Sequence, residues 1–175
     1  MIMNNITLVG FMGTGKTTVA KLLSRSLNMH YVSSDDLIEE KEGMSINSIF
    51  REKGEEYFRA SESDVLREIL DREGQVVDAG GGVMLDEENV RLLREHSILI
   101  CLTADAETVY ERTGRQSHRP LLNVEDPLGK IKELMRKRRS FYDKAPYHID
   151  TSSFNIEETL KAVKNVVEKD IGQRS

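Results

Sequence analysis

The sequence lacks the features that mark secreted, disulfide-bonded and membrane-spanning proteins. It holds one cysteine, Cys101, within the apolar run ILICL. A single cysteine excludes a disulfide framework, and its apolar neighbours favour a buried strand thiol over a reactive one. No apolar run approaches the roughly 18–20 residues that a membrane-spanning helix needs. The first residues, MIMNN, contain no basic segment of a secretion signal. We therefore expect a cytoplasmic protein.

Basic residues are also in short supply. The chain has 25 lysines and arginines against 30 aspartates and glutamates, which gives a net charge of −5. A general nucleic-acid binder would usually carry a basic surplus, so we expect no nucleic-acid partner, and no membrane partner either. An acidic composition without an apolar patch is compatible with a monomer.

The chain shows no internal repeat, low-complexity segment or interdomain linker, and its 175 residues suit a single domain, 1–175. Apolar strand-like runs alternate with amphipathic helix-like runs. This alternation predicts an α/β protein whose parallel sheet is covered on both faces, with ligands beyond the carboxyl ends of the strands. The first expected strand begins at residue 6, and the other four cover residues 31–34, 75–78, 98–102 and 148–150. The expected helices include residues 17–27, 45–53, 55–72, 105–113 and 127–144.

Residues 6–17, ITLVGFMGTGKT, carry the clearest functional pattern. Gly10, Gly15, Lys16 and Thr17 fit G-x-x-x-x-G-K-[ST], the loop that cradles nucleotide phosphates. Glycines let backbone N–H groups approach phosphate oxygens, the lysine adds a positive charge, and the hydroxyl is offered to Mg²⁺. A turn that only joins a strand to a helix is the structural alternative, and the strand–loop–helix order argues against it.

A phosphate loop alone does not separate kinases from GTPases, motor ATPases or regulatory switches. No Asn-Lys-x-Asp guanine-reading motif occurs, which argues against a GTPase. A small kinase also needs an acceptor pocket, a lid and metal ligands. Polar clusters that can supply them follow strands or lie beyond a helix, at residues 33–36, 78–82 and 114–119.

Six motifs together resemble the shikimate kinases along the full length of the chain. They are the phosphate loop 10–17, Ser34-Asp35, Phe58-Arg59, Gly80-Gly81-Gly82, Arg119-Pro120-Leu121-Leu122, and Arg138 with Tyr142. The resemblance implies ATP-dependent phosphorylation of the shikimate 3-hydroxyl, in aromatic amino acid and chorismate biosynthesis. It also implies a P-loop kinase fold with three α/β/α layers, a five-stranded parallel sheet of order 2-3-1-4-5, a substrate-binding segment at about 35–62 and a mobile lid at about 114–126.

The same resemblance implies roles on the nucleotide side. The implied ATP-binding residues are Gly13, Thr14, Gly15, Lys16, Thr17, Thr18, Arg112, Arg119 and Asn155. Arg112 would lie against the adenine. Lys16 and the lid residue Arg119 would act in catalysis by neutralising charge on the transferring phosphoryl group.

On the acceptor side, the implied substrate-binding residues are Asp35, Arg59, Gly80, Gly81, Gly82 and Arg138. The two arginines can clamp the shikimate carboxylate through bidentate forks. Each has an alternative: Arg59 as a solvated helix charge, and Arg138 as one member of a basic run. By resemblance Asp35 is catalytic, since it holds the acceptor hydroxyls and can take a proton; a helix N-cap is its other reading. Glu62 can orient Arg59 or form an exposed pair with it.

One position departs from the family pattern. The family usually carries Asp-x-Asp after the second strand, and here the first of these positions is Ser33. Family members often have serine or threonine where this chain has Asp78, at the end of the third strand. Our hypothesis is that carboxylate and hydroxyl have exchanged strands, so that Thr17 and Asp78 hold Mg²⁺. The alternative for Asp78 is a turn residue bonded to the glycine backbone.

Two other functions remain as alternatives. A gluconate kinase or another small-molecule kinase of the same fold would lack the combined Asp35, Arg59, triple-glycine and Arg119-Pro120 pattern. A non-catalytic ATP-binding protein is suggested by Ser33. The retention of four residues together argues against it: Lys16, Thr17, Asp35 and Arg119.

Overall fold

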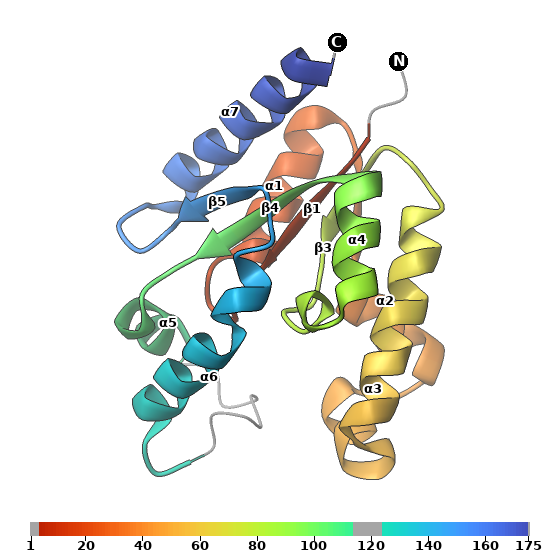
Figure 1. The fold of residues 1–175 in the computed structure, drawn as a ribbon, viewed down its shortest axis with the longest axis vertical. Helices are drawn as coiled ribbons and strands as arrows, with labels where there is room; N and C mark the ends of the chain where they lie inside the picture. The colour runs from red at the N-terminus through yellow and green to blue at the C-terminus, as the bar shows by residue number, and fades with distance from the viewer. Residues whose placement is uncertain (1–3, 114–123, 175) are drawn as a thin grey trace.

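The computed structural model describes residues 4–113 and 124–174. Its centre is a parallel sheet of five strands in the order β2-β3-β1-β4-β5, as the resemblance implies (Figure 1). The strands are β1 (Asn5–Gly10), β2 (His30–Ser33), β3 (Gln75–Asp78), β4 (Ser97–Thr103) and β5 (Tyr147–Asp150).

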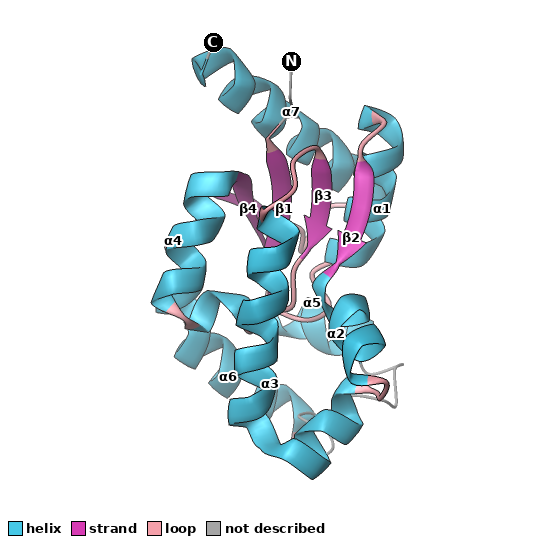
Figure 2. Ribbon diagram, turned by 90° about the vertical axis from the view of Figure 1, so that its right-hand side faces the viewer, coloured by secondary structure: helices cyan, strands magenta, loops and turns pink. Residues whose placement is uncertain are grey.

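Helices cover both faces of this sheet (Figure 2). One face packs against α1 (Lys16–Leu27) and α7 (Ile156–Arg174). The helices on the other side are α2 (Ser34–Glu42), α3 (Ile46–Leu70), the short 3₁₀ helix η1 (Val83–Leu85), α4 (Glu87–His96), α5 (Ala106–Thr113) and α6 (Pro127–Tyr142). No helix in the described ranges is both long and apolar enough to cross a membrane.

The central strands are buried on both faces because a layer of helices lies against each face of the sheet. In β4, Ile98 and Ile100 join the core beneath α1 and α7, whereas Leu99 and Cys101 join the core on the opposite side. Successive strand side chains point to opposite faces. One uninterrupted apolar run therefore supplies both cores, and the Cys101 thiol is buried as predicted.

Element boundaries differ from the predicted ones at a few positions. The two helices expected at 45–53 and 55–72 are assigned as one helix, α3, but Gly54 has φ 86° and ψ 170° and interrupts it. Ser34, expected to end a strand, begins α2 instead. The reason is that Ser33 caps this helix, with its hydroxyl oxygen accepting a hydrogen bond from the Asp36 N–H at 3.2 Å.

The strand ends place the phosphate loop at one edge of the sheet. Gly10 pairs with Leu102 in the β1–β4 register and has φ +138°. A Cβ on Gly10 would overlap the backbone carbonyl of Leu102. Only glycine therefore lets the chain leave β1 here and turn directly into the loop. Ser33 and Asp78 end β2 and β3 at the same edge, in register with each other.

Candidate active site

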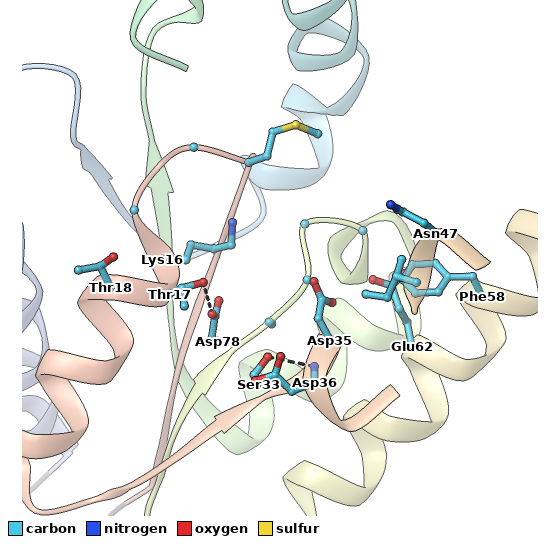
Figure 3. Close-up of a pocket in the computed structure, with 18 of the residues that line it drawn as sticks. Lys16, Thr17, Thr18, Ser33, Asp35, Asp36, Asn47, Phe58, Glu62 and Asp78 are labelled. Atoms are coloured by element: carbon cyan, nitrogen blue, oxygen red, sulfur yellow. Dashed lines mark hydrogen bonds between the residues drawn. The ribbon is translucent and has the colours of Figure 1, made fainter. Parts of the chain in front are cut away.

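A cavity of about 720 Å³ lies at the carboxyl edge of the sheet (Figure 3). Its wall joins residues that are far apart in the sequence: the phosphate loop, the ends of β2 and β3, the glycine turn after β3, and parts of α3 and α6. The predicted site residues among those that line it are Gly13, Gly15, Lys16, Thr17, Thr18, Asp35, Arg59, Asp78, Gly80, Gly81, Gly82, Arg112 and Arg138.

The phosphate loop leads into the N-terminus of α1 at this cavity. Gly13 and Gly15 have φ values of 75° and 92°, which glycine adopts without strain. Gly15 is the N-cap of α1 and supplies no side chain to bond the first N–H groups. Lys16 closes the loop, with Nζ donating to the carbonyls of Gly10 at 2.9 Å and Phe11 at 3.0 Å. An anion is the ligand that such a terminus attracts.

The structure brings Thr17 and Asp78 into contact. The Thr17 hydroxyl donates to Asp78 Oδ2 at 2.5 Å, and Asp78 is 8% exposed (Figure 3). Ser33 lies beside this carboxylate in the sheet register. The Asp78 carboxylate therefore bonds a side chain of the phosphate loop. The alternative drawn from sequence, a turn residue bonded to the glycine backbone, does not include this contact.

The donor set at this edge fits a magnesium ion bound together with a nucleotide. In residues 4–113 and 124–174, no group of three or more His, Cys, Asp and Glu side chains is arranged to hold a metal. Mg²⁺ in nucleotide sites keeps several waters and takes one or two protein ligands plus phosphate oxygens. One hydroxyl, from Thr17, and one carboxylate, from Asp78, suit that coordination.

A tyrosine that the sequence analysis missed also contacts this carboxylate. The Tyr31 hydroxyl donates to Asp78 Oδ2 at 3.3 Å. Burial, helped by the negative charges of Asp78 and Asp36, raises the pKa of Tyr31 to about 12. The hydroxyl is therefore protonated at neutral pH and available as a donor. Its position two residues before Ser33 puts it on the same face of β2, which is the one sequence signal that it carries.

Asp35 lies in the first turn of α2 and points into the cavity (Figure 3). The helix N-cap is Ser33, so Asp35 does not have the capping role left open from sequence. Burial and the nearby charge of Asp78 raise the pKa of Asp35, and Lys16 opposes them. A Cβ on Gly80 would lie 2.7 Å from Asp35 Oδ1. The glycine thus lets the turn after β3 pass directly beside this carboxyl group.

Arg59 is held in place by two glutamates of its own helix. It forms ion pairs with Glu62, which is 2% exposed, and with Glu55 at 3.1 Å. Its side chain is 26% exposed and its guanidinium carbon lies 5.2 Å from the Phe58 ring centroid. A Cβ on Gly82 would overlap the guanidinium. Arg59 is therefore packed against the glycine turn and is not a freely solvated helix charge.

Arg138 of α6 reaches the same cavity, with its guanidinium carbon 5.8 Å from the Phe11 ring centroid. Tyr142, one turn later, donates its hydroxyl to the Gly81 carbonyl at 2.7 Å. Burial raises the pKa of Tyr142 to about 12, so this donor too is protonated at neutral pH. The contact ties α6, and with it Arg138, to the same glycine turn against which Arg59 packs.

The remaining nucleotide-side predictions fall in different places. Arg112 bonds the Gly13 carbonyl at 3.2 Å and the Thr151 carbonyl at 2.8 Å, joining the phosphate loop to the segment after β5. Thr14 is buried and donates to the Phe11 carbonyl at 2.8 Å. Asn155 forms a capping box with Glu158 at the start of α7 and is not among the residues that line the cavity. Arg119 and residues 114–123 of the lid expected at about 114–126 lie outside the described residues.

Replacing Glu62 by glutamine is expected to weaken acceptor binding, because Arg59 loses its buried anionic partner. A hydrogen bond to a charged group contributes about 1.5–3 kcal/mol, which corresponds to a rise of about 10- to 100-fold in KM for the acceptor. Glu55→Gln is the matched control: Glu55 is 65% exposed, and an exposed pair contributes less than about 1 kcal/mol. Steady-state kinetics compare the two variants, and equal KM values would contradict the role given to Glu62.

Fold and site together define a P-loop kinase. The phosphate loop follows the central strand β1, and an acidic side chain and two arginines line the same cavity. A gluconokinase from Sinorhizobium meliloti shares this fold, with 15% sequence identity, a TM-score of 0.59 and 100% of both chains covered.

Closer relatives narrow the class, and the chain belongs to the shikimate kinase family. The family model "Shikimate kinase" matches residues 12–168. A shikimate kinase of Thermodesulfovibrio yellowstonii is 42% identical over 161 residues, covering 92% of this chain and 93% of that protein. The solved structure of a shikimate kinase from Acinetobacter baumannii in complex with shikimate is 35% identical, with a TM-score of 0.90 and 96% and 94% of the two chains covered.

Proposed function

We propose that this chain transfers the γ-phosphoryl group of ATP to the 3-hydroxyl of shikimate, giving shikimate 3-phosphate and ADP for aromatic amino acid biosynthesis. Family membership supports the activity. The observation that carries it is one cavity that is lined both by the phosphate loop and by Asp35, Arg59 and Arg138. Shikimate is a carboxylate that bears three hydroxyls, so these side chains match its groups.

The phosphate loop would hold the ATP phosphates through its backbone N–H groups. Lys16 would leave the carbonyls of Gly10 and Phe11 and pair with the β- and γ-phosphates. Thr18 lies in the first turn of α1, whose N-terminus would face the same anion. Arg112 bonds both the Gly13 carbonyl of the loop and the Thr151 carbonyl after β5. Its proposed contact with adenine would therefore place the base near Thr151.

The side chains of Asp35, Arg59 and Arg138 would orient shikimate toward the γ-phosphate. Arg59, held by Glu62, and Arg138, set by Tyr142, would pair with the substrate carboxylate. Asp35 would accept a hydrogen bond from the attacking hydroxyl and take its proton as the O–P bond forms. The pKa of Asp35 is raised in the direction of neutral pH, which suits a group that must both accept and release a proton.

Thr17 and Asp78 would hold Mg²⁺, which neutralises charge on the phosphate oxygens when bound. Ser33 is not offered as a ligand, because its oxygen caps α2. The exchange of carboxylate and hydroxyl between β2 and β3 is supported by their neighbouring positions in the sheet register. Two adjacent positions can supply a carboxylate to the same edge.

We infer a single domain that acts as a cytoplasmic monomer without nucleic-acid or membrane partners. The net charge of −5 supports this inference, as do the exposed apolar side chains, which are few and scattered among the described residues.

Arg119, closing over the phosphates from the lid, and Asn155, near the adenine, remain predictions from the family resemblance.

A coupled ADP-release assay tests the proposed activity. We expect ADP release from ATP to depend on shikimate, and gluconate and nucleoside monophosphates to give less than about 1% of that rate, since acceptors that cannot satisfy the site's polar groups are rejected strongly. Turnover with gluconate alone would favour a different small-molecule kinase. ATP binding without turnover on any acceptor would favour a non-catalytic protein.

A further inference from the structure

The carboxylate of Asp78 has two hydrogen-bond donors, and they come from different elements. Thr17 donates from α1 at 2.5 Å and Tyr31 donates from β2 at 3.3 Å. Both bonds end on the same oxygen, Oδ2. Among the residues that the structure describes, no side-chain hydrogen bond ends on the other oxygen, Oδ1. One oxygen of the carboxylate is thus anchored and the other is available to a ligand in the cavity that Asp78 lines.

Of these two donors, only Tyr31 is independent of the nucleotide. Thr17 belongs to the phosphate loop and would also have to serve phosphates and metal. Tyr31 sits on β2, diagonal to Asp78 across the β2–β3 pair. Its contact can therefore persist through binding and release of the nucleotide.

The Tyr31 ring is itself immobilised from two sides. It packs against the apolar core beneath α1 and α7. From the α1 side, the Lys21 ammonium lies 5.3 Å from the ring centroid, within the range of a cation–π interaction. Lys21 is one helical turn after Thr17, so one face of α1 positions both donors to Asp78.

We propose that Tyr31 is a positioning residue, which orients the Asp78 carboxylate so that Oδ1 faces the metal bound with the nucleotide. Rotation about χ2 of aspartate is broad and roughly two-fold, so hydrogen bonds decide which oxygen faces the cavity. Partners of this kind commonly contribute 10- to 100-fold to metal affinity. The inference rests on the proposed metal role of Asp78.

The test measures metal binding without turnover. Binding of Mn²⁺, standing in for Mg²⁺, to the enzyme–ADP complex is followed by electron paramagnetic resonance of the free ion. Tyr31→Phe removes the hydroxyl and keeps the ring. We expect it to weaken Mn²⁺ binding about 10-fold, while ADP affinity in EDTA and thermal stability stay at wild-type values. Tyr110→Phe, on the exposed face of α5 and outside the cavity lining, is the control and should change none of these.

A double-mutant cycle separates this inference from the role of Asp78 itself. In an Asp78→Asn background, adding Tyr31→Phe should change Mn²⁺ affinity less than about two-fold, since the two residues act as one unit. Wild-type Mn²⁺ binding by Tyr31→Phe, with weakened binding by Asp78→Asn, would overturn the inference and leave the metal role of Asp78 intact. An equal loss in both backgrounds would also overturn it. Unchanged binding by Asp78→Asn would overturn both.

Discussion

Asp35→Asn is expected to lower kcat by about 10²- to 10⁴-fold, the usual contribution of a positioned general base. Asparagine keeps the size and polarity of the side chain but cannot accept the proton of the attacking hydroxyl. Asp35 reaches the cavity from the first turn of α2, opposite Lys16. The α2 cap would persist, because Ser33 provides it. Steady-state kinetics with saturating ATP and shikimate measure the effect.

Asp36→Asn is the matched control, since Asp36 is the next residue in the same helical turn and also lines the cavity. We expect it to change kcat less than about five-fold, within the range of surface charge changes. The pH dependence gives a second readout. Because the pKa of Asp35 is raised, its basic form is lost at a pH above the ordinary aspartate pKa of about 3.9. The wild-type rate should fall on this acidic limb, and a profile of the same shape in Asp35→Asn would contradict the assignment.

Asp78→Asn is expected to raise the Mg²⁺ concentration that gives half-maximal activity by about 10- to 100-fold. The substitution removes the only carboxylate that contacts Thr17 among the described residues. Measurements at fixed ATP across a Mg²⁺ series separate this change from a loss of nucleotide binding. A wild-type Mg²⁺ dependence would contradict the proposed exchange of ligands between β2 and β3.

A second substitution tests the exchange directly. Ser33 is the register partner of Asp78, and aspartate is as good an N-cap as serine. Ser33→Asp combined with Asp78→Ser should therefore recover most of the Mg²⁺ affinity that Asp78→Ser alone loses. Ser33→Asp without the second change is the control for α2 stability. Absence of recovery, with normal thermal unfolding, would show that position 33 cannot supply the ligand in this chain.

The sequence was informative where function depends on local chain geometry. The phosphate loop needs glycines at fixed spacing before a lysine and a hydroxyl, and all of them lie within the eight residues 10–17. The sheet followed from apolar runs such as the one around Cys101, which are typical of parallel strands covered on both faces. The prediction of strand order came instead from the family resemblance, and the observed register confirms it.

Contacts across the sheet were harder to predict. Tyr31 touches Asp78 only because β2 and β3 pair in one particular register, and no spacing along the chain encodes a diagonal contact between strands. Arg59 shows the same limit, since its burial depends on a glycine turn more than 20 residues away in sequence. In the sequence, Ser33 stands where the family usually carries a carboxylate. Its use as the cap of α2 is visible only in the structure, where the helix begins at Ser34.

The central claim is transfer of the γ-phosphoryl group to one hydroxyl of shikimate, and the product tests it most directly. The enzyme would be incubated with ATP, Mg²⁺ and shikimate, and the mixture examined by ³¹P–¹H correlation NMR. We predict a single new phosphomonoester whose phosphorus correlates with the proton on carbon 3 of the ring, together with an equal amount of ADP. ADP without a phosphorylated shikimate, or a phosphate on another hydroxyl, would contradict the proposed function.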